Sequence, residues 1–271
     1  MPITRARLAR AERMAGAAAT RPDPRLAAYR ADPARLMADA GLAPDPWQQD
    51  LLRSDADRVL MLTCRQAGKS TTAGFLALRE ALLHPGRTVL QVSRSQRQST
   101  ELFRRTVEAF NRLGRPGGAA AESATRLELG NGSRVLSLPG SEANIRCYTI
   151  HMAILDEAAR IADPLYFDVR PMLATTGGKL VCLSTAFAKS GFFYDAWTGP
   201  DAWTRVKVTA DMNPRVSRAF LDEERRVLGP RWFGMEHLCE FGDDAAAVFR
   251  ADDIRAALAD DTLAPLFGRR S

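Results

Sequence analysis

The sequence is poor in the residues that build metal centres and disulfide frameworks. It has four cysteines and three histidines in 271 residues. The cysteines form no C-x-x-C pair and the histidines match no ligand spacing; the residues concerned are Cys64, Cys147, Cys182, Cys239, His84, His151 and His237. We therefore assign no zinc module, and a reduced, intracellular compartment fits best.

Long apolar runs are also missing. No uninterrupted apolar stretch approaches the roughly 18 residues of a membrane helix. Four arginines lie between residues 5 and 13 without an apolar core behind them, so this end is not a secretory signal. Glu12, Asp23 and Asp32 argue against a transit peptide. The sequence thus predicts no membrane association.

Composition and charge are those of an ordinary globular chain with a basic bias. The length allows one large domain or a domain with appendages. Hydrophobic residues make up 46% and charged residues 26%, which is typical of soluble proteins. A formal net charge of +6 favours an anionic partner such as nucleic acid. On charge alone, a basic surface without such a partner remains an equal alternative.

Residues 58–83 carry the pattern around which we interpret the chain. An apolar run at 59–62 predicts a short buried strand, and a loop follows it. From Lys69 onward, Phe75, Leu78 and Leu82 recur at roughly helical spacing. A helix that begins at Lys69 points free N–H groups and its positive dipole end at an anion. The pattern therefore predicts a phosphate-binding loop between a strand and a helix.

The end of this loop, Gly68-Lys69-Ser70, matches the end of the P-loop pattern. There the glycine allows close approach of the backbone, the lysine reaches the β- and γ-phosphates of ATP, and the serine hydroxyl binds Mg²⁺. The pattern is degenerate, because Thr63 stands where its first glycine belongs. The alternative is a helix N-terminus that carries Gly-Lys-Ser by chance.

A second apolar run, residues 149–155, ends in Asp156-Glu157. In open parallel sheets the carboxyl ends of strands meet where ligands bind. We expect Asp156 to hold Mg²⁺ together with Ser70, and Glu157 to orient and polarise the attacking water. The alternative is a helix that starts with Asp-Glu-Ala-Ala.

The remaining periodicities predict an α/β fold with a mainly parallel sheet, flanking helices and a β-hairpin insertion. A strand ending in Ser184 and Thr185 would reach the γ-phosphate if it lies beside the strand of Asp156. Further strands are predicted at 87–93, 178–185 and, at an edge, 203–209; the hairpin at 125–138; a loop at 114–121; and helices at 8–18, 24–40, 95–113, 217–228 and 252–259. The first two helices are expected to pack loosely.

An aromatic residue beside an amide precedes the first strand, at Trp47-Gln48. Such a pair could stack on a base and hydrogen-bond to its edge. From the residues alone, Trp47 is more simply a core anchor and Gln48 a surface residue. The Ala-, Arg-, Asp- and Pro-rich residues 1–45 ahead of this element are predicted to be a helical or flexible segment.

Taken together, these pieces resemble the ATPase half of phage large terminases, the DNA-packaging motors. The matching segments are Trp47-Gln48, the loop 64–70, residues 144–146 ahead of Ile154-Leu155-Asp156-Glu157-Ala158, and residues 183–186 followed by Gly191-Phe192-Phe193. The resemblance spans residues 46–241 and implies that they are an ATPase domain with a P-loop NTPase fold of the ASCE/RecA-like type. By the same resemblance, residues 242–271 are a tether. No single motif is diagnostic, but their order and spacing are specific.

The resemblance also implies roles that spacing does not give. Arg65 would touch the γ-phosphate as a catalytic arginine, although a neighbouring subunit can supply that arginine instead. Gln48 would read adenine, while Ser184 and Thr185 would couple hydrolysis to movement. The nucleotide would lie on the loop residues Arg65, Gln66, Ala67, Gly68, Lys69, Ser70 and Thr71.

By the same resemblance the function is ATP hydrolysis that drives double-stranded DNA into a procapsid in the bacterial cytoplasm. The implied partners are DNA, a portal protein, a small terminase subunit and further copies in a ring. Large terminases continue into a nuclease, which we expect to be absent here or encoded separately, so DNA cleavage is not expected. The alternatives are a helicase-like ATPase and a non-catalytic prophage remnant that binds DNA or portal.

Overall fold

The structure is a computed structural model of the chain, and it describes residues 23–139 and 148–243. Its centre is an eight-stranded sheet in the order β3-β4-β5-β2-β6-β7-β1-β8. The six strands from β5 to β8 in that order are parallel, while β3, β4 and β5 are antiparallel neighbours. The strands are β1 (Arg58–Thr63), β2 (Thr88–Ser93), β3 (Ala119–Glu122), β4 (Arg126–Leu129), β5 (Arg134–Pro139), β6 (Met152–Asp156), β7 (Lys179–Ser184) and β8 (Thr204–Val208).

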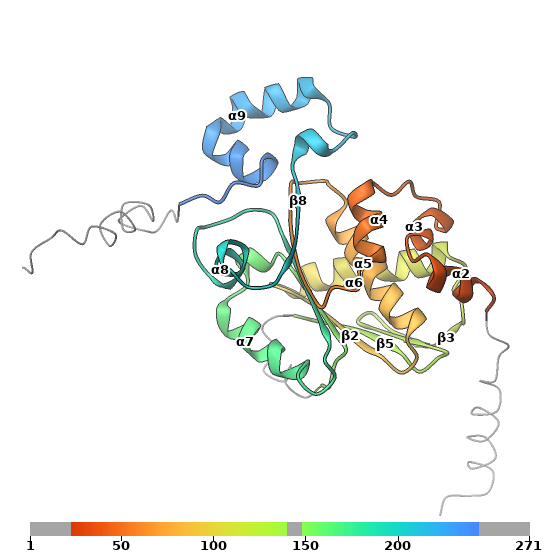
Figure 1. Cartoon of the computed structure of the whole chain (residues 1–271). Helices are drawn as coiled ribbons and strands as arrows, with labels where there is room; N and C mark the ends of the chain where they lie inside the picture. Colours follow the sequence, from red (N-terminus) through yellow and green to blue (C-terminus); the bar gives the residue numbers. More distant parts are fainter. Residues whose placement is uncertain (1–22, 140–147, 244–271) are drawn as a thin grey trace, which may run out of the picture.

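Helices cover both faces of the sheet (Figure 1). Side chains alternate along β1, so that Val59 and Met61 join one apolar cluster and Leu60 and Leu62 join the other. This is a three-layer α/β/α arrangement, as predicted. The helices are α2 (Arg25–Ala31), α3 (Arg35–Asp39), α4 (Pro46–Arg53), α5 (Lys69–Leu83), α6 (Gln96–Arg112), α7 (Asp163–Met172), α8 (Phe192–Thr198) and α9 (Arg218–His237), with 3-10 turns η2 (Ala158–Arg160) and η3 (Ala210–Met212).

The strand order brings the two predicted motifs together. Strand β7 lies between β1, which leads into the loop, and β6, which ends in Asp156. In register, Leu62 of β1 is opposite Ser184, and Asp156 is opposite Leu183. Because the three strands are parallel, their carboxyl ends form one edge of the sheet. The loop before α5 and the residues after β6 and β7 therefore share this edge.

The predicted hairpin is confirmed as β4 and β5, and β5 continues the parallel sheet beside β2. The predicted loop at 114–121 is wrong in its last residues, because β3 begins at Ala119 and pairs with β4. All four residues of β3 are exposed, so no alternation of apolar and polar side chains marks the strand. Its partner strand is what defines it.

The helix predicted at 24–40 is two short helices, α2 and α3, with Pro33 between them. The expected loose packing is wrong for this part of the chain. Tyr29 and Leu36 are 1% and 0% exposed and belong to the same apolar cluster as α5. The helix predicted at 8–18 lies outside the described residues.

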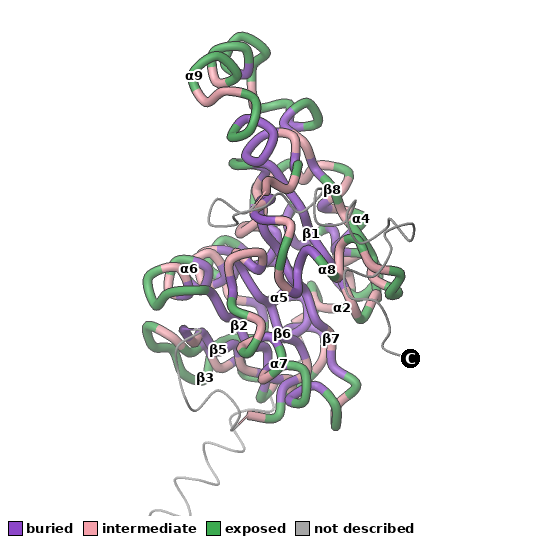
Figure 2. The backbone as a smooth tube through the Cα atoms, turned by 90° about the vertical axis from the view of Figure 1, so that its left-hand side faces the viewer, coloured by how far each residue is buried: buried purple, intermediate pink, exposed green. Residues whose placement is uncertain are grey.

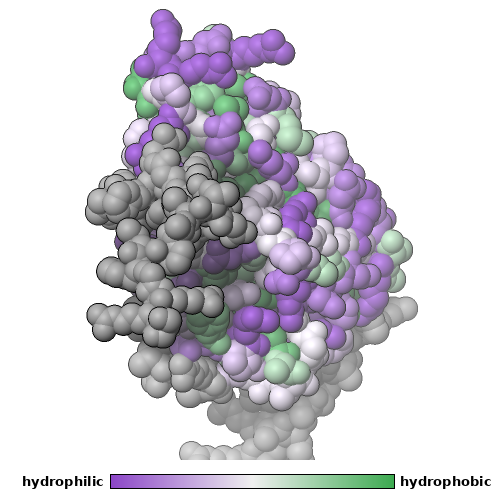
Figure 3. Space-filling view, turned by 60° about the vertical axis from the view of Figure 1, so that its left-hand side comes forward, coloured by the Kyte–Doolittle hydropathy of each residue, from purple (hydrophilic) through white to green (hydrophobic). Residues whose placement is uncertain are grey.

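Helix α9 extends beyond the predicted 217–228 and ends at His237. A kink at Gly229, with φ 70°, and Pro230 interrupts it, which explains why a sequence pattern stops there. The helix stands apart from the sheet (Figures 1 and 2) and exposes Val227 and Trp232. Both hydrophobic and hydrophilic side chains lie on the surface of the lobe at the top of Figure 3.

Among the described helices, none combines the length and apolarity needed to cross a bilayer. The helix predicted at 252–259 is outside the described range.

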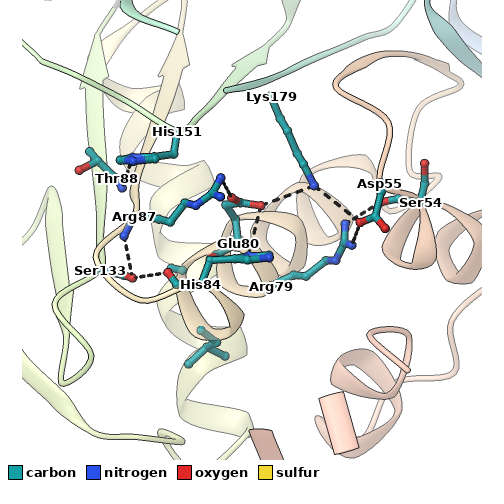
Figure 4. A network of polar contacts seen from close by, with 12 residues as sticks. Ser54, Asp55, Arg79, Glu80, His84, Arg87, Thr88, Ser133, His151 and Lys179 are labelled. Carbon is teal, nitrogen blue, oxygen red and sulfur yellow. Dashed lines mark hydrogen bonds and ion pairs between the residues drawn. The ribbon is translucent and has the colours of Figure 1, made fainter. Parts of the chain in front are cut away.

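A polar network joins the elements at the amino ends of the strands (Figure 4). Its centre is Glu80 of α5, whose carboxylate is fully buried. Arg87, just before β2, donates to its Oε1 at 2.8 Å. The Nζ of Lys179, at the start of β7, lies 3.8 Å from Glu80 Oε2, and the Nδ1 of His84 lies 3.7 Å from the same oxygen. Glu80 thus ties the helix behind the phosphate loop to two strand starts.

Replacing Glu80 by glutamine is expected to lower the free energy of unfolding by about 3 kcal/mol. The change leaves Arg87 without its buried counter-charge and leaves Lys179 with only the exposed Asp55 carboxylate. The measurement is urea unfolding of the variant beside Glu108→Gln, which alters an exposed carboxylate on α6. The control is expected to stay within about 0.5 kcal/mol of the parent. Equal stability of the two variants would contradict the structural role of Glu80.

Candidate active site

A cleft of about 670 Å³ opens at the carboxyl edge of β1, β6 and β7. Four segments contribute to it: the loop before α5 with the first turn of that helix, the stretch from the end of β2 to the middle of α6, the turn after β6 and the residue after β7. Its lining residues are Cys64, Arg65, Gln66, Gly68, Lys69, Ser70, Thr71, Arg94, Gln98, Glu101, Arg105, Glu157, Arg160 and Thr185.

The loop before α5 has the geometry of an anion cradle. Gly68 is the N-cap of α5 with φ 88°, a left-handed conformation that glycine adopts without strain. A side chain at this position would meet the Gln48 amide at 3.0 Å from its Cβ. Among the described residues, no side chain caps the start of α5. Since the first-turn N–H groups of a helix have no intrahelical partner, they are available to a phosphate.

Lys69 is a largely buried cation on the lining of the cleft. Its Nζ lies 2.5 Å from Glu157 Oε1 and 3.3 Å from Asp156 Oδ1. The side chains of Lys69 and Asp156 are only 10% and 9% exposed. The lysine-bearing turn and the acidic pair, far apart in the sequence, therefore meet around one small volume, as the sequence predicts.

Burial and charge act in opposite directions on this cluster. Burial alone would lower the pKa of the Lys69 ammonium, but the carboxylates of Asp156 and Glu157 raise it above its usual value. Burial raises the pKa of Asp156, and the Lys69 ammonium opposes that rise. The Lys69 ammonium is thus the main favourable partner of the ionised Asp156 carboxylate.

Glu157 has an unusual backbone conformation for a residue with a side chain. Its φ is 55° and its ψ 41°, in the left-handed region, which costs about 1–3 kcal/mol. Its N–H donates to Asp156 Oδ1 at 3.0 Å. This turn places the two adjacent carboxylates on the same lysine, whereas an extended strand would point them to opposite faces.

The donor set of the cleft fits a nucleotide with Mg²⁺. Ser70 offers a hydroxyl and Asp156 a carboxylate, and Mg²⁺ prefers such oxygen ligands. Among residues 23–139 and 148–243 no cluster of three or more His, Cys, Asp or Glu could hold a metal by itself. A Mg²⁺ ion here would take its other ligands from phosphate and water, as it commonly does.

Arg65, predicted to be catalytic, lies on the lining but is bound to α9. Its Nε donates to Glu236 Oε2 at 2.6 Å, and its backbone N–H donates to the Glu236 carbonyl at 3.0 Å. The side chain is 67% exposed. The Glu236 side chain is only 10% exposed, so moving the arginine to a phosphate would leave a largely buried carboxylate without this partner.

Four predicted residues do not line the cleft, namely Gln48, Ala67, Asp156 and Ser184. Of these, Asp156 adjoins the lining through its ion pair with Lys69. The expectation from the residues alone that Gln48 is a surface residue is wrong, because it is 4% exposed. Its Oε1 accepts from the Asp45 N–H and its Nε2 donates to Thr72 Oγ1, both at 2.8 Å. Gln48 thus stabilises the first turn of α5 through its hydrogen bond to Thr72.

Ser184 is buried and faces η2, where its Oγ accepts from the Ala159 N–H at 3.2 Å. Thr185, the next residue, lies on the lining. The end of β7 therefore touches both the cleft and the turn that follows Glu157. Residues 144–146, which the resemblance included, lie outside the described residues.

Five charged or polar residues of the lining were not predicted from the sequence. These lining residues are Arg94, Gln98, Glu101, Arg105 and Arg160. A usable signal existed for Arg94, because it directly follows β2, whose carboxyl end lies at the same edge. The α6 residues carry no such signal, since a long polar helix face reads as a solvated one.

Comparison with known proteins places the chain in a family. A family model for the terminase large subunit, T4likevirus-type, N-terminal, matches residues 60–256. The match extends past residue 241, where we placed a domain boundary. No curated protein matches the sequence.

Solved structures share the fold. The Thermus phage P74-26 large terminase ATPase domain is 23% identical with a TM-score of 0.67, over 77% of this chain and 98% of that one. The HK97 bacteriophage large terminase is 14% identical with a TM-score of 0.61, over 76% and 55%. A large terminase from a thermophilic bacteriophage, in complex with ATP-gamma-S, is 13% identical with a TM-score of 0.58, over 72% and 52%. This chain thus spans about half the length of the last two.

These likenesses confirm the predicted P-loop NTPase fold. Since the family model covers more than half of the 271 residues, the chain belongs to the terminase large subunit family, T4likevirus-type, and corresponds to its N-terminal part.

Proposed function

We propose that this chain is an Mg²⁺-dependent ATPase whose hydrolysis cycle drives the translocation of double-stranded DNA. The observation that carries the proposal is the contact of Lys69, at the start of a helix, with Asp156 and Glu157 at the end of a parallel strand. That arrangement combines a phosphate cradle, a cation and a carboxylate beside one cleft. Family membership and the ATP-gamma-S complex of the thermophilic phage terminase support the nucleotide.

In the proposed cycle the first turn of α5 binds the phosphates through its N–H groups, and Lys69 moves from the carboxylates to the β- and γ-phosphates. Bound Mg²⁺, held by Ser70 and Asp156, would neutralise charge that develops on the phosphates. Gln66, Ala67, Gly68 and Thr71 contribute the loop backbone and its entry into the helix.

Once Lys69 is engaged with phosphate, Glu157 is released to orient a water molecule for in-line attack on the γ-phosphorus. Arg65 and Thr185 are proposed to contact the γ-phosphate from the cleft lining. Ser184, which is hydrogen-bonded to Ala159, is proposed to couple hydrolysis of the γ-phosphate to a movement of η2. Gln48 is proposed to contact adenine through the amide hydrogen not used for Thr72. An arginine from a second copy in a ring is an alternative to Arg65.

We further propose residues 46–241 as the ATPase domain and the family's packaging apparatus as its setting. DNA, a portal protein, a small terminase subunit and other copies of the chain are the proposed partners. The net charge of +6 supports a polyanion among them.

The test is ATP hydrolysis by the purified chain, measured with and without double-stranded DNA and with EDTA. We expect Mg²⁺-dependent phosphate release that DNA stimulates, without strand separation. Strand separation would favour the helicase-like alternative. Absence of both turnover and nucleotide binding would favour a non-catalytic remnant and overturn the proposal.

A further inference from the structure

The Glu157 carboxylate has a second cation besides Lys69. Arg160 Nε lies 3.9 Å from Glu157 Oε2, on the oxygen that Lys69 does not contact. If Lys69 turns to the phosphates, as proposed above, Oε1 loses its partner. Within the described residues, Arg160 is then the cation that remains within ion-pair distance of Glu157.

The guanidinium of Arg160 is itself held in place. Its Cζ lies 4.3 Å from the centroid of the Phe187 ring, within the range of a cation–π contact. Its side chain is only 25% exposed, and its backbone N–H donates to the Glu157 carbonyl at 2.8 Å. The neighbouring Ala159 N–H is bound to Ser184. A guanidinium seated between an aromatic face and a carboxylate has few other positions to adopt.

From this geometry we propose that Arg160, seated on Phe187, is a positioning residue that holds the Glu157 carboxylate toward the cleft while Lys69 is bound to phosphate. The inference rests on the proposed function. Because Phe187 follows β7 in the segment after Thr185, the same contact attaches Glu157 to that segment. Arg160 acts through Glu157 and touches no reacting atom.

The first test separates turnover from binding. Arg160→Ala is expected to lower kcat about 10- to 100-fold, the range seen for outer-shell partners, with KM for ATP and the affinity for a fluorescent ADP within about threefold of the parent. Phe187→Leu keeps the charge but removes the ring, so a smaller loss of about threefold to tenfold is expected. Arg170→Ala is the matched control, because Arg170 lies over Tyr166 outside the cleft at 5.6 Å.

The second test asks whether Arg160 works through Glu157. Added to Glu157→Gln, Arg160→Ala is expected to change kcat by less than about threefold, because the group it positions is already lost. Millimolar guanidinium is expected to restore part of the turnover of Arg160→Ala, which a variant with a merely disturbed fold would not show.

Three results overturn the inference alone, provided that the parent hydrolyses ATP: unchanged kcat in Arg160→Ala, a rise in KM with kcat unchanged, or losses that multiply in the double variant. Loss of turnover equal to that of Arg160→Ala in the Arg170→Ala control does so as well. A parent chain that binds no nucleotide and hydrolyses none overturns the proposed function, and this inference with it.

Discussion

Replacing Lys69 by alanine is expected to lower ATP turnover by at least about 10²- to 10³-fold, the range for loss of one preorganised charge donor. Lys69 is the only lysine on the lining of the described cleft. It lies where a helix start presents its N–H groups to an anion. Its loss removes the charge that binds the β- and γ-phosphates, so nucleotide affinity is expected to fall together with kcat.

The alanine variant has a structural effect that must be measured separately. Without the ammonium, the Asp156 carboxyl loses the charge that opposes the effect of burial, so its pKa is expected to rise further. Thermal unfolding of Lys69→Ala and of Lys69→Met, which keeps more of the volume, shows whether the fold survives. Lys207→Ala on the exposed edge strand β8 is the control and should retain full turnover. Phosphate release from folded Lys69→Ala at the parental rate would refute the assignment of Lys69.

Replacing Glu157 by glutamine is expected to slow hydrolysis about 10²-fold or more while nucleotide binding is retained. The amide keeps the size of the side chain and its contact with Lys69, but it cannot accept a proton from the attacking water. Removing one of the two carboxylates from Lys69 also frees the lysine for phosphate, so binding should be as tight as in the parent or tighter.

Single-turnover hydrolysis and equilibrium binding of a fluorescent nucleotide measure the two effects independently. Glu128→Gln, on the β-hairpin and paired with Arg126, provides a matched carboxylate outside the cleft. Loss of binding and of hydrolysis in equal proportion would show that Glu157 shapes the site and has no part in the chemical step.

The sequence predicted the parts of the fold and site that local patterns encode. The buried strand β1, the helix start at Lys69 and the acidic end of β6 each lie within a short stretch with its own periodicity. Their meeting could be predicted because parallel strands bring their carboxyl ends to one edge. The left-handed conformation of Glu157 could not, because no residue preference indicates it at a glutamate.

What depends on distant partners was missed. Strand β3 exists through its pairing with β4, and the packing of α2 and α3 depends on the surface of α5. Gln48 reads as a surface residue until Asp45 and Thr72 surround its amide. The role proposed for Arg160 depends on its contact with Phe187, which follows the end of a different strand, β7.

The most direct test of the central claim is a crystal structure of the chain with Mg²⁺ and a non-hydrolysable ATP analogue. We expect the phosphates on the N–H groups at the start of α5, with Lys69 Nζ moved from Glu157 to the β- and γ-phosphates and Glu157 facing the γ-phosphorus. An analogue bound elsewhere, with Lys69 still paired to Asp156 and Glu157, would contradict the account.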